Sequence, residues 1–231
     1  LEETAVLLNL MAKSGRDTGV AANYLHLYTG MPQQESGLQQ LANSDVLTIS
    51  SLRHGELVKP VLDGSAFSLN ENTLEISTAS VFSRLMGLFS AGQARTDIDA
   101  AGYLSDTSQW RGLVSVRSPW NPERVVVLVT GTDDHQLQQL PADMLKPTFK
   151  SNASGDFMAV TDTSDARSWR VGEQFTRGDL PGYLMILWFA SQHIFGLTLL
   201  ACLIAAIASP LLYRKLKRHA HQRLQDKSHH E

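Results

Sequence analysis

The feature that constrains this chain most is a long stretch near its C-terminus without a single charged side chain. From Leu180 to Tyr213 there is no Asp, Glu, Lys or Arg, and most positions are apolar. One helix over the whole stretch would be about 50 Å long, well beyond a hydrocarbon core of about 30 Å. The polar triplet Ser191-Gln192-His193 divides it. We therefore expect an interfacial amphipathic helix over 180–193 and one transmembrane helix over 194–213, with a single long tilted helix as the alternative.

Basic residues follow this stretch at once and predict its orientation. The segment 214–231 is rich in Lys and Arg, whereas the residues just before the stretch carry both signs of charge. An excess of Lys and Arg close to a span marks the cytoplasmic side. The tail is therefore expected in the cytoplasm, and the region 1–179 on the opposite side of the membrane.

Two groups of residues in the predicted membrane segment are candidates for packing against a partner or against membrane lipid. Small side chains recur every four residues, which favours close approach of another helix, although a lipid-facing helix rich in Ala would show the same pattern. Aromatic residues mark headgroup depth. The candidates are Tyr183, Trp188, Phe189, Ala201, Ala205 and Ser209.

Charge and cysteine content narrow the class of the region before the membrane segment. Acidic residues outnumber basic ones there, so it lacks the basic surface that nucleic acid requires. The one cysteine, Cys202, lies in the apolar stretch, which excludes an internal disulfide. The first residues resemble no signal peptide and predict a helix with Ala5, Leu8 and Ala12 on one stripe. We expect the chain to begin inside a larger protein.

The region 1–179 alternates apolar runs of strand length with amphipathic stretches and turn residues, which predicts an α/β fold with a mainly parallel sheet and flanking helices. Val125–Val129 is wholly apolar, as expected of a strand covered on both faces. Crossover helices are expected over Thr78–Ala91 and His135–Leu145, the second capped by Thr132-Asp133-Asp134. Strands are expected at Tyr24–Tyr28, Val46–Ser50, Leu113–Val116, Arg124–Thr130 and Phe157–Thr161, with a final edge strand at Trp169–Phe175.

No motif in the sequence assembles catalytic chemistry. The chain has no G-x-S-x-G, no H-E-x-x-H, no phosphate-binding loop and no G-x-G-x-x-G. We interpret Asp97 and Asp99 as a solvated charge cluster on a loop, Asp133 to His135 as a helix cap rather than a metal site, and His26 as a packed or edge residue of a strand. We therefore assign no catalytic, cofactor-binding or metal-binding residue.

Several short motifs together resemble the end of one known family. They cover roughly the last half of the chain and are Ser118-Pro119-Trp120-Asn121-Pro122-Glu123-Arg124, Arg170-Val171-Gly172-Glu173, Leu180-Pro181 and Trp188-Phe189-Ala190. This combination resembles the BcsB family of bacterial cellulose synthase, whose members are the periplasmic and membrane-anchored partners of the catalytic subunit. The resemblance implies a flavodoxin-like domain followed by an anchor.

The resemblance also implies a function. It predicts a non-catalytic, single-pass inner-membrane subunit whose bulk lies in the periplasm. The expected partners are the catalytic subunit, the nascent glucan and membrane lipid, and self-association as a homo-oligomer stays open. Such proteins are named for cyclic di-GMP, which is cytoplasmic, so we expect that nucleotide on the catalytic partner and no cofactor here. The alternatives are a membrane-tethered periplasmic α/β hydrolase and a single-span receptor.

Overall fold

The computed structural model describes residues 2–20, 25–77, 96–172, 181–184, 198, 201–210, 213 and 217. The chain divides into two compact units. The first consists of Leu1–Ser80 and Arg95–Asp179, and the second of Val81–Ala94 and Leu180–Glu231. The folded architecture described below belongs to the first unit.

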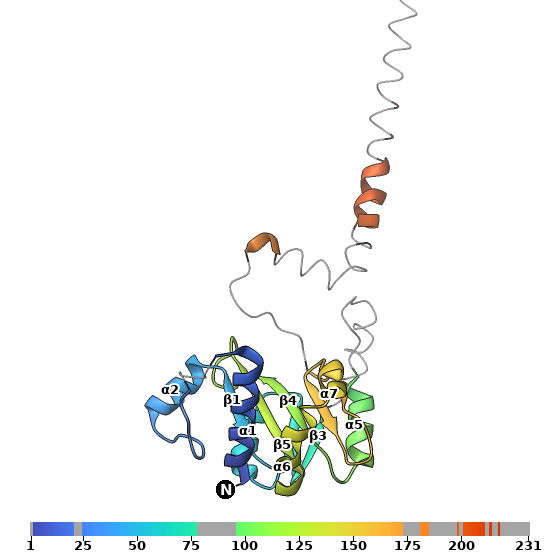
Figure 1. Cartoon of the computed structure of the whole chain (residues 1–231). Coiled ribbons are helices and arrows are strands. Elements are labelled where there is room, and N and C mark those ends of the chain that lie inside the picture. The colour runs from blue at the N-terminus through green and yellow to red at the C-terminus, as the bar shows by residue number, and fades with distance from the viewer. Residues whose placement is uncertain are drawn as a thin grey trace, which may run out of the picture. The chain divides into compact units, whose positions relative to one another are not determined.

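A five-stranded sheet forms the centre of this unit (Figure 1). Its strands are β1 (Val46–Ile49), β4 (Arg111–Arg117), β5 (Val125–Gly131), β6 (Phe157–Val160) and β7 (Arg167–Trp169). Their order in the sheet is β1-β5-β4-β6-β7. The predicted runs at Val46, Leu113, Arg124 and Phe157 are thus confirmed as strands. The last predicted strand, Trp169–Phe175, shares only Trp169 with the edge strand β7; residues 170–172 are not in a strand, and 173–175 lie outside the described residues.

The prediction of a mainly parallel sheet is wrong. Only β1 and β5 run parallel, whereas β4 pairs antiparallel with both β5 and β6, and β6 pairs antiparallel with β7. A parallel pair needs a crossover of a dozen or more residues between its strands. The links 118–124 and 161–166 are too short for one and contain no helix. The chain therefore turns back at both links, and the fold is mixed α/β with a mostly antiparallel sheet.

One face of the sheet is covered by helices α1 (Glu2–Thr18), α6 (Asp134–Asp143) and α7 (Pro147–Asn152). Helices α1 and α6 pack side by side (Figure 1). Between these helices and the sheet lies a core of apolar side chains that includes Val6, Leu10, Val129, Leu137, Leu140, Phe149, Met158 and Val160. The predicted helix His135–Leu145 and its cap are confirmed by α6.

The opposite face is covered by α3 (Gly55–Leu62), α5 (Asp97–Asp106) and a hairpin of β2 (Phe67–Asn70) and β3 (Thr73–Ile76). Glu71 and Asn72 have positive φ, as a two-residue turn of this kind requires. The larger core lies here and includes Leu52, Val58, Leu74, Trp110, Val114, Val126, Leu128 and Phe157. Because both faces are covered, β5 can be apolar at consecutive positions, as its sequence predicted.

Two local expectations near the N-terminus are wrong. Helix α1 exists, but it buries Val6 and Leu10 rather than the stripe with Ala5 and Leu8, and Leu8 is exposed. The predicted strand Tyr24–Tyr28 is absent from its described residues 25–28, which are irregular and exposed. These residues precede α2 (Glu35–Asn43) and pair with no strand in the part of the chain that the structure describes.

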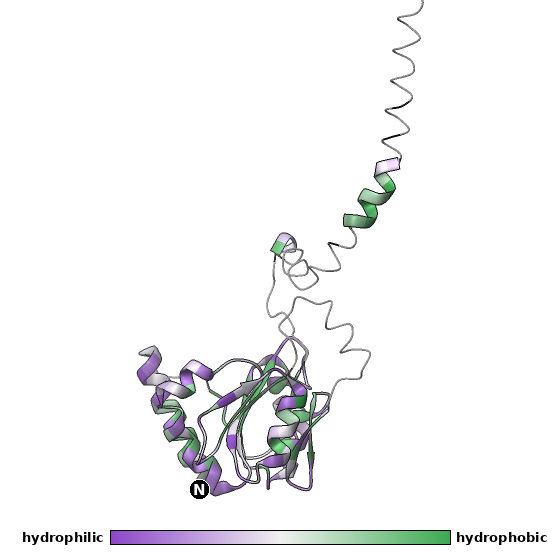
Figure 2. Cartoon of the chain, turned by 90° about the vertical axis from the view of Figure 1, so that its right-hand side faces the viewer, coloured by the Kyte–Doolittle hydropathy of each residue, from purple (hydrophilic) through white to green (hydrophobic). Residues whose placement is uncertain are grey.

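About half of the predicted membrane segment 180–213 lies outside the described residues, and the predicted helix Thr78–Ala91 lies wholly outside them. Among the residues that are described, no helix combines the length and the apolar character needed to cross a membrane. Residues 201–210 are helical and mostly hydrophobic (Figure 2). The interfacial helix over 180–193 and the transmembrane helix over 194–213 stay predictions.

Candidate functional site

The carboxyl ends of the parallel strands β1 and β5 are the place where α/β sheets commonly bind ligands. Polar side chains do gather there. The hydroxyl of Ser51 donates to the carboxylate of Asp134, and Nδ1 of His54 lies 3.1 Å from Oε1 of Glu3. Ser51 and the neighbouring Leu52 are fully buried. Ser51 and Leu52 are therefore part of the packed interior.

This arrangement is not that of a hydrolase. A nucleophilic serine must lie beside a histidine base that a third group orients. Here Ser51 is bonded directly to Asp134, and His54 is bonded to a different acid. The other acid in the predicted cap, Asp133, accepts from the backbone N–H of Gln136 at 2.8 Å. The polar groups at this end of the sheet serve as caps and ties.

The motif Ser118–Arg124 forms the tight link between β4 and β5. The backbone N–H of Ser118 donates to the carbonyl of Arg124 at 2.9 Å and closes the link. The amide of Asn121 donates to the carbonyl of Ala42 at 2.7 Å, which ties the link to α2. Ser118 is buried and Trp120 packs against the larger core. This part of the family resemblance therefore reflects a structural turn.

A buried ion cluster around Arg111 was missed by the sequence analysis. Its guanidinium donates to Asp143 at 2.5 Å, to Gln136 at 2.7 Å and to Asp162 at 2.6 Å. Lys146 also donates to Asp143, at 2.6 Å. The side chains of Arg111 and Asp143 are each only 5% exposed, whereas Asp162 faces solvent. The cluster joins the start of β4 to the end of α6 and to the turn after β6.

The charges in this cluster fix its protonation. Burial of the Asp143 carboxyl disfavours its charge, yet the hydrogen bonds from Arg111 and Lys146 outweigh burial and hold its pKa below the ordinary value. The hydrogen bond from Arg111 likewise lowers the pKa of Asp162. Arg111, Asp143 and Asp162 are thus charged at neutral pH and bonded to one another. The cluster is a tie between elements and offers no poised acid or base.

The residues that begin the Arg170-Val171-Gly172 motif are bound tightly where the chain leaves the sheet. The backbone N–H of Thr96 donates to the carbonyl of Arg170, and the N–H of Arg170 donates back to Oγ1 of Thr96, both at 2.9 Å. The carboxylate of Asp156 accepts from the N–H groups of Val171 at 2.7 Å and Gly172 at 2.5 Å. We call these five residues the exit junction.

Two glycines allow the exit junction to close this tightly. At Gly172 a Cβ would lie 2.8 Å from the Asp156 carboxylate, and at Gly155 it would lie 2.1 Å from the carbonyl oxygen of Trp169. Gly155 also has φ of +87°, which other residues rarely adopt. Gly172, the glycine of the Arg170-Val171-Gly172 motif, therefore leaves the space that the Asp156 carboxylate needs. Along the sequence, Thr96 follows one change of compact unit and Arg170 precedes the other.

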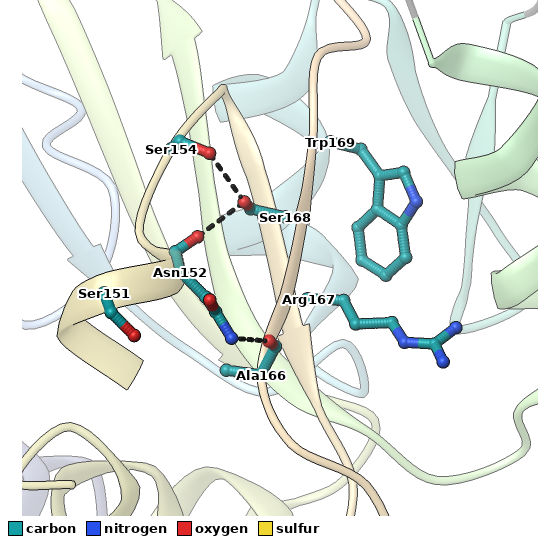
Figure 3. Close-up of a pocket in the computed structure, with 7 residues that line it drawn as sticks. All are labelled: Ser151, Asn152, Ser154, Ala166, Arg167, Ser168 and Trp169. Atoms are coloured by element: carbon teal, nitrogen blue, oxygen red, sulfur yellow. Dashed lines mark hydrogen bonds between the residues drawn. The ribbon is translucent and has the colours of Figure 1, made fainter. Parts of the chain in front are cut away.

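An open pocket of about 410 Å³ lies between α7 and the edge strand β7. The hydroxyl of Ser168 donates to the carbonyl of Asn152 at 2.6 Å and lies 3.0 Å from the hydroxyl of Ser154. Figure 3 shows these three residues on one side of β7, with the side chains of Arg167 and Trp169 extending from the other side. The full lining is Ser151, Asn152, Ser154, Ala166, Arg167, Ser168 and Trp169. We call this the β7 pocket; sequence patterns gave no signal for it.

The predicted packing residues of the membrane segment are only partly described. Ala201, Ala205 and Ser209 lie on one helical stretch and are exposed, and Tyr183 is 66% exposed. Trp188 and Phe189 lie outside the described residues. The structure therefore leaves their packing role as a prediction.

Two interpretations of polar residues need correction. Asp97 and Asp99 lie in the first turn of α5 rather than on a loop, and Asp97 is buried. An acid in the first turn of a helix is stabilised by the helix dipole. His26 is neither packed nor at a strand edge, since it lies exposed in the irregular segment before α2.

Comparison with known proteins identifies relatives of this chain. A family model described as "Cellulose synthase BcsB, second FD domain" matches residues 1–129. The matched part holds α1 to β5, whereas the motifs singled out in the sequence lie mostly beyond it. The two lines of evidence overlap only around the link 118–124, so each supports the other from a different part of the chain.

Curated relatives extend the match over most of the chain. A "Cyclic di-GMP-binding protein" of Komagataeibacter sucrofermentans is 22% identical over 190 residues, which are 80% of this chain and 23% of that protein. One of the same name from Komagataeibacter xylinus is 21% identical over 193 residues, with 79% and 23% covered. "Cellulose synthase 1" of Komagataeibacter xylinus is 25% identical over 191 residues, with 80% and 12% covered. The chain thus spans less than a quarter of the length of these relatives.

Proposed function

The chain belongs to the BcsB family of cellulose synthase subunits, and on this premise we propose that it is a non-catalytic, membrane-anchored part of a bacterial cellulose synthase complex. Its bulk would lie in the periplasm and its basic tail in the cytoplasm. It would hold the catalytic subunit in its working arrangement and help to guide the emerging glucan. The observation that carries this proposal is the family match over more than half of the chain.

The geometry of the described region supports a role without catalysis. The polar groups at the carboxyl ends of β1 and β5 are used as ties, and Ser51 and His54 are bonded to different acids. The Arg111 cluster satisfies its own charges. A hydrolase on a membrane tether would need a nucleophile and a base side by side. Neither cluster offers that arrangement, which favours a scaffold over the hydrolase alternative.

The exit junction supports an anchoring role. It fixes the backbone at Arg170 to Gly172, from which the chain continues to the predicted interfacial helix 180–193 and transmembrane helix 194–213. A rigid attachment lets a membrane anchor orient the domain above it. The names of two relatives refer to cyclic di-GMP. We propose that this nucleotide acts on the catalytic partner in the cytoplasm and that the present chain responds as its partner.

The decisive experiment separates membrane insertion from partnership. Replacing Ala201, Ala205 and Ser209 together by Leu keeps the segment apolar but removes the small-residue stripe. We expect the variant to reach the membrane at normal levels, to co-purify less catalytic subunit and to support less glucan synthesis in reconstituted membranes. The control is Ala206→Leu, which adds bulk at one position beside the stripe and leaves the stripe itself intact.

Two outcomes would contradict the proposal. If the wild-type chain co-purified with no glycosyltransferase, the assignment to a synthase complex would fall. If a chimera carrying an unrelated span in place of Tyr183–Tyr213 sustained full synthesis, the membrane segment would be only a tether. In that second case the function would have to lie in the periplasmic region.

A further inference from the structure

The β7 pocket has a lining whose chemistry selects a class of ligand. On the side of β7 that carries Ser168, the pocket presents the hydroxyls of Ser151, Ser154 and Ser168 and the amide of Asn152 (Figure 3). Hydroxyl and amide groups both donate and accept hydrogen bonds. No lining residue is acidic, so a cation would find no carboxylate there. Arg167 is the one charged residue of the lining, and its side chain extends from the opposite side of β7, so the side that carries Ser168 offers no positive charge to favour an anion over a neutral ligand.

The polar groups of the pocket are held in place by hydrogen bonds: Ser151 donates to the carbonyl of Thr148 in α7 at 3.1 Å, and the others bond to one another or to Ala166. Ser168 is bonded to Asn152 and Ser154, and the amide of Asn152 donates to the carbonyl of Ala166 at 2.8 Å. A hydroxyl oxygen that makes such a bond keeps further capacity to accept. A network fixed before binding loses little side-chain freedom when a ligand arrives. The arrangement therefore suits a neutral ligand that carries many hydroxyl groups.

The same edge is poorly suited to an added peptide strand. Alternate residues of an edge strand offer their backbone groups outward. The carbonyl of Ala166 is already taken by Asn152, and both backbone groups of Arg170 are taken by Thr96. Among the outward-facing positions, Ser168 alone lies between Ala166 and Arg170, whose backbone groups are occupied in this way. An incoming strand would therefore find its partners occupied at both ends of β7.

We propose that the β7 pocket binds a short stretch of neutral β-linked glucan. This inference rests on the proposed function, which places a nascent glucan near the domain. The volume of about 410 Å³ lies within the usual range of about 300–1,000 Å³ for small-molecule sites. The pocket is open rather than enclosed, which lets a chain pass over it instead of ending inside it. The site is non-catalytic and serves as a contact along the path of the polymer.

The test is a titration of the full chain in detergent with cellohexaose, followed by calorimetry. We expect wild-type protein to bind, and Ser168→Gln to bind undetectably because its longer side chain fills the pocket. Ser154→Ala should weaken binding about 2- to 12-fold, the effect of one neutral hydrogen bond. Ser105→Ala is the matched control, since Ser105 is an exposed serine on α5 that does not line the pocket. The affinity of this variant for cellohexaose should equal that of wild type.

Three results would overturn the inference. They are no binding of cellohexaose by wild type, unchanged binding by folded Ser168→Gln protein, and a preference for a charged oligosaccharide such as oligogalacturonate. Folding of each variant is checked by its thermal melting. A photocrosslinker placed at position 168 tests a protein partner. If it reacted with a peptide of the catalytic subunit and the protein bound no sugar, the pocket would be a protein contact instead.

The proposed function is tested separately on the same proteins. Ser168→Gln should co-purify the catalytic subunit as wild type does, because the substitution leaves the sequence of the predicted membrane segment unchanged. Normal co-purification without glucan binding by wild type would remove this inference and leave the proposed function standing. Glucan binding by wild type without co-purification of the catalytic subunit would leave the pocket as a glucan site and remove the proposed function.

Discussion

Thr96 and Arg170 lie 74 residues apart in the sequence and exchange two hydrogen bonds of 2.9 Å through their backbone and the Thr96 hydroxyl. Asp156 adds two more bonds to the next two residues. The junction thus joins two stretches of the first compact unit that are distant in the sequence. This relationship makes the junction a target for substitution.

Replacing Asp156 by Ala should loosen the exit junction. The N–H groups of Val171 and Gly172 would lose a charged acceptor, and such bonds are worth about 1.5–3 kcal/mol. We expect trypsin to cut after Arg170 much faster than in wild type, while the rest of the domain stays resistant. Mass spectrometry of timed digests locates the cut. Asp165→Asn, which changes an exposed acid nearby, is the control, and an unchanged rate of cutting after Arg170 in Asp156→Ala would contradict the prediction.

Removing Arg111 should destabilise the domain strongly. Arg111→Ala leaves the Asp143 carboxylate buried without its main partner, and breaking a buried pair in this way costs about 3–5 kcal/mol. The double change Arg111→Met with Asp143→Leu removes both charges and should cost less than Arg111→Ala alone. Urea unfolding followed by tryptophan fluorescence measures both. Equal or greater loss in the double variant would show that the charges themselves contribute net stability.

The same pair predicts a dependence of stability on pH. The pKa of Asp143 is lowered in the folded protein, so its contribution is fully present above the unfolded value of about 3.9. The contribution of Asp143 to the free energy of unfolding should therefore change little between pH 7 and pH 5. It should fall as the pH drops below about 4 and approaches the lowered folded pKa. The double variant Arg111→Met with Asp143→Leu should show a shallower fall, and an identical profile would refute the assignment.

Gly112 should tolerate no side chain. A Cβ at this position of β4 would lie 1.8 Å from the carbonyl oxygen of Met158 on the neighbouring strand. Gly112→Ala should therefore lower the free energy of unfolding by about 1–3 kcal/mol or more. Gly102→Ala is the matched control, because Gly102 lies within α5 with nothing near its Cβ position. That change should raise stability by up to about 1 kcal/mol through helix propensity, and the two thermal melts are compared directly.

The strands were predictable where their sequences are apolar and rich in β-branched residues. Val125–Val129 could be placed on a doubly covered strand because a strand buried on both faces needs no polar positions. The direction of the strands was not predictable in the same way, since it depends on whether a link turns back or crosses over. The link 118–124 turns back and is held by hydrogen bonds from Ser118 and Asn121. Their partners are Arg124 and Ala42, and the sequence alone does not identify these pairs.

The Arg111 cluster and the β7 pocket could not be found from the sequence for a different reason. Arg111 meets partners that lie 25, 32 and 51 residues away, and no local period links such positions. The serines of the pocket come from a short helix, a turn and an edge strand, each of which looks like an ordinary polar surface. For α1 the helix was predicted correctly, but its buried face was set by Val6 and Leu10 meeting α6 and the sheet.

The exit junction also determines how the domain would resist a pull along the chain. Tension applied beyond Gly172 would act first on its bond and that of Val171 to Asp156, and on the paired bonds of Thr96 and Arg170. Asp156 directly precedes β6, an interior strand of the sheet. Force applied from the C-terminal side of Gly172 would therefore reach the interior strand β6 before it could peel β7 from the edge.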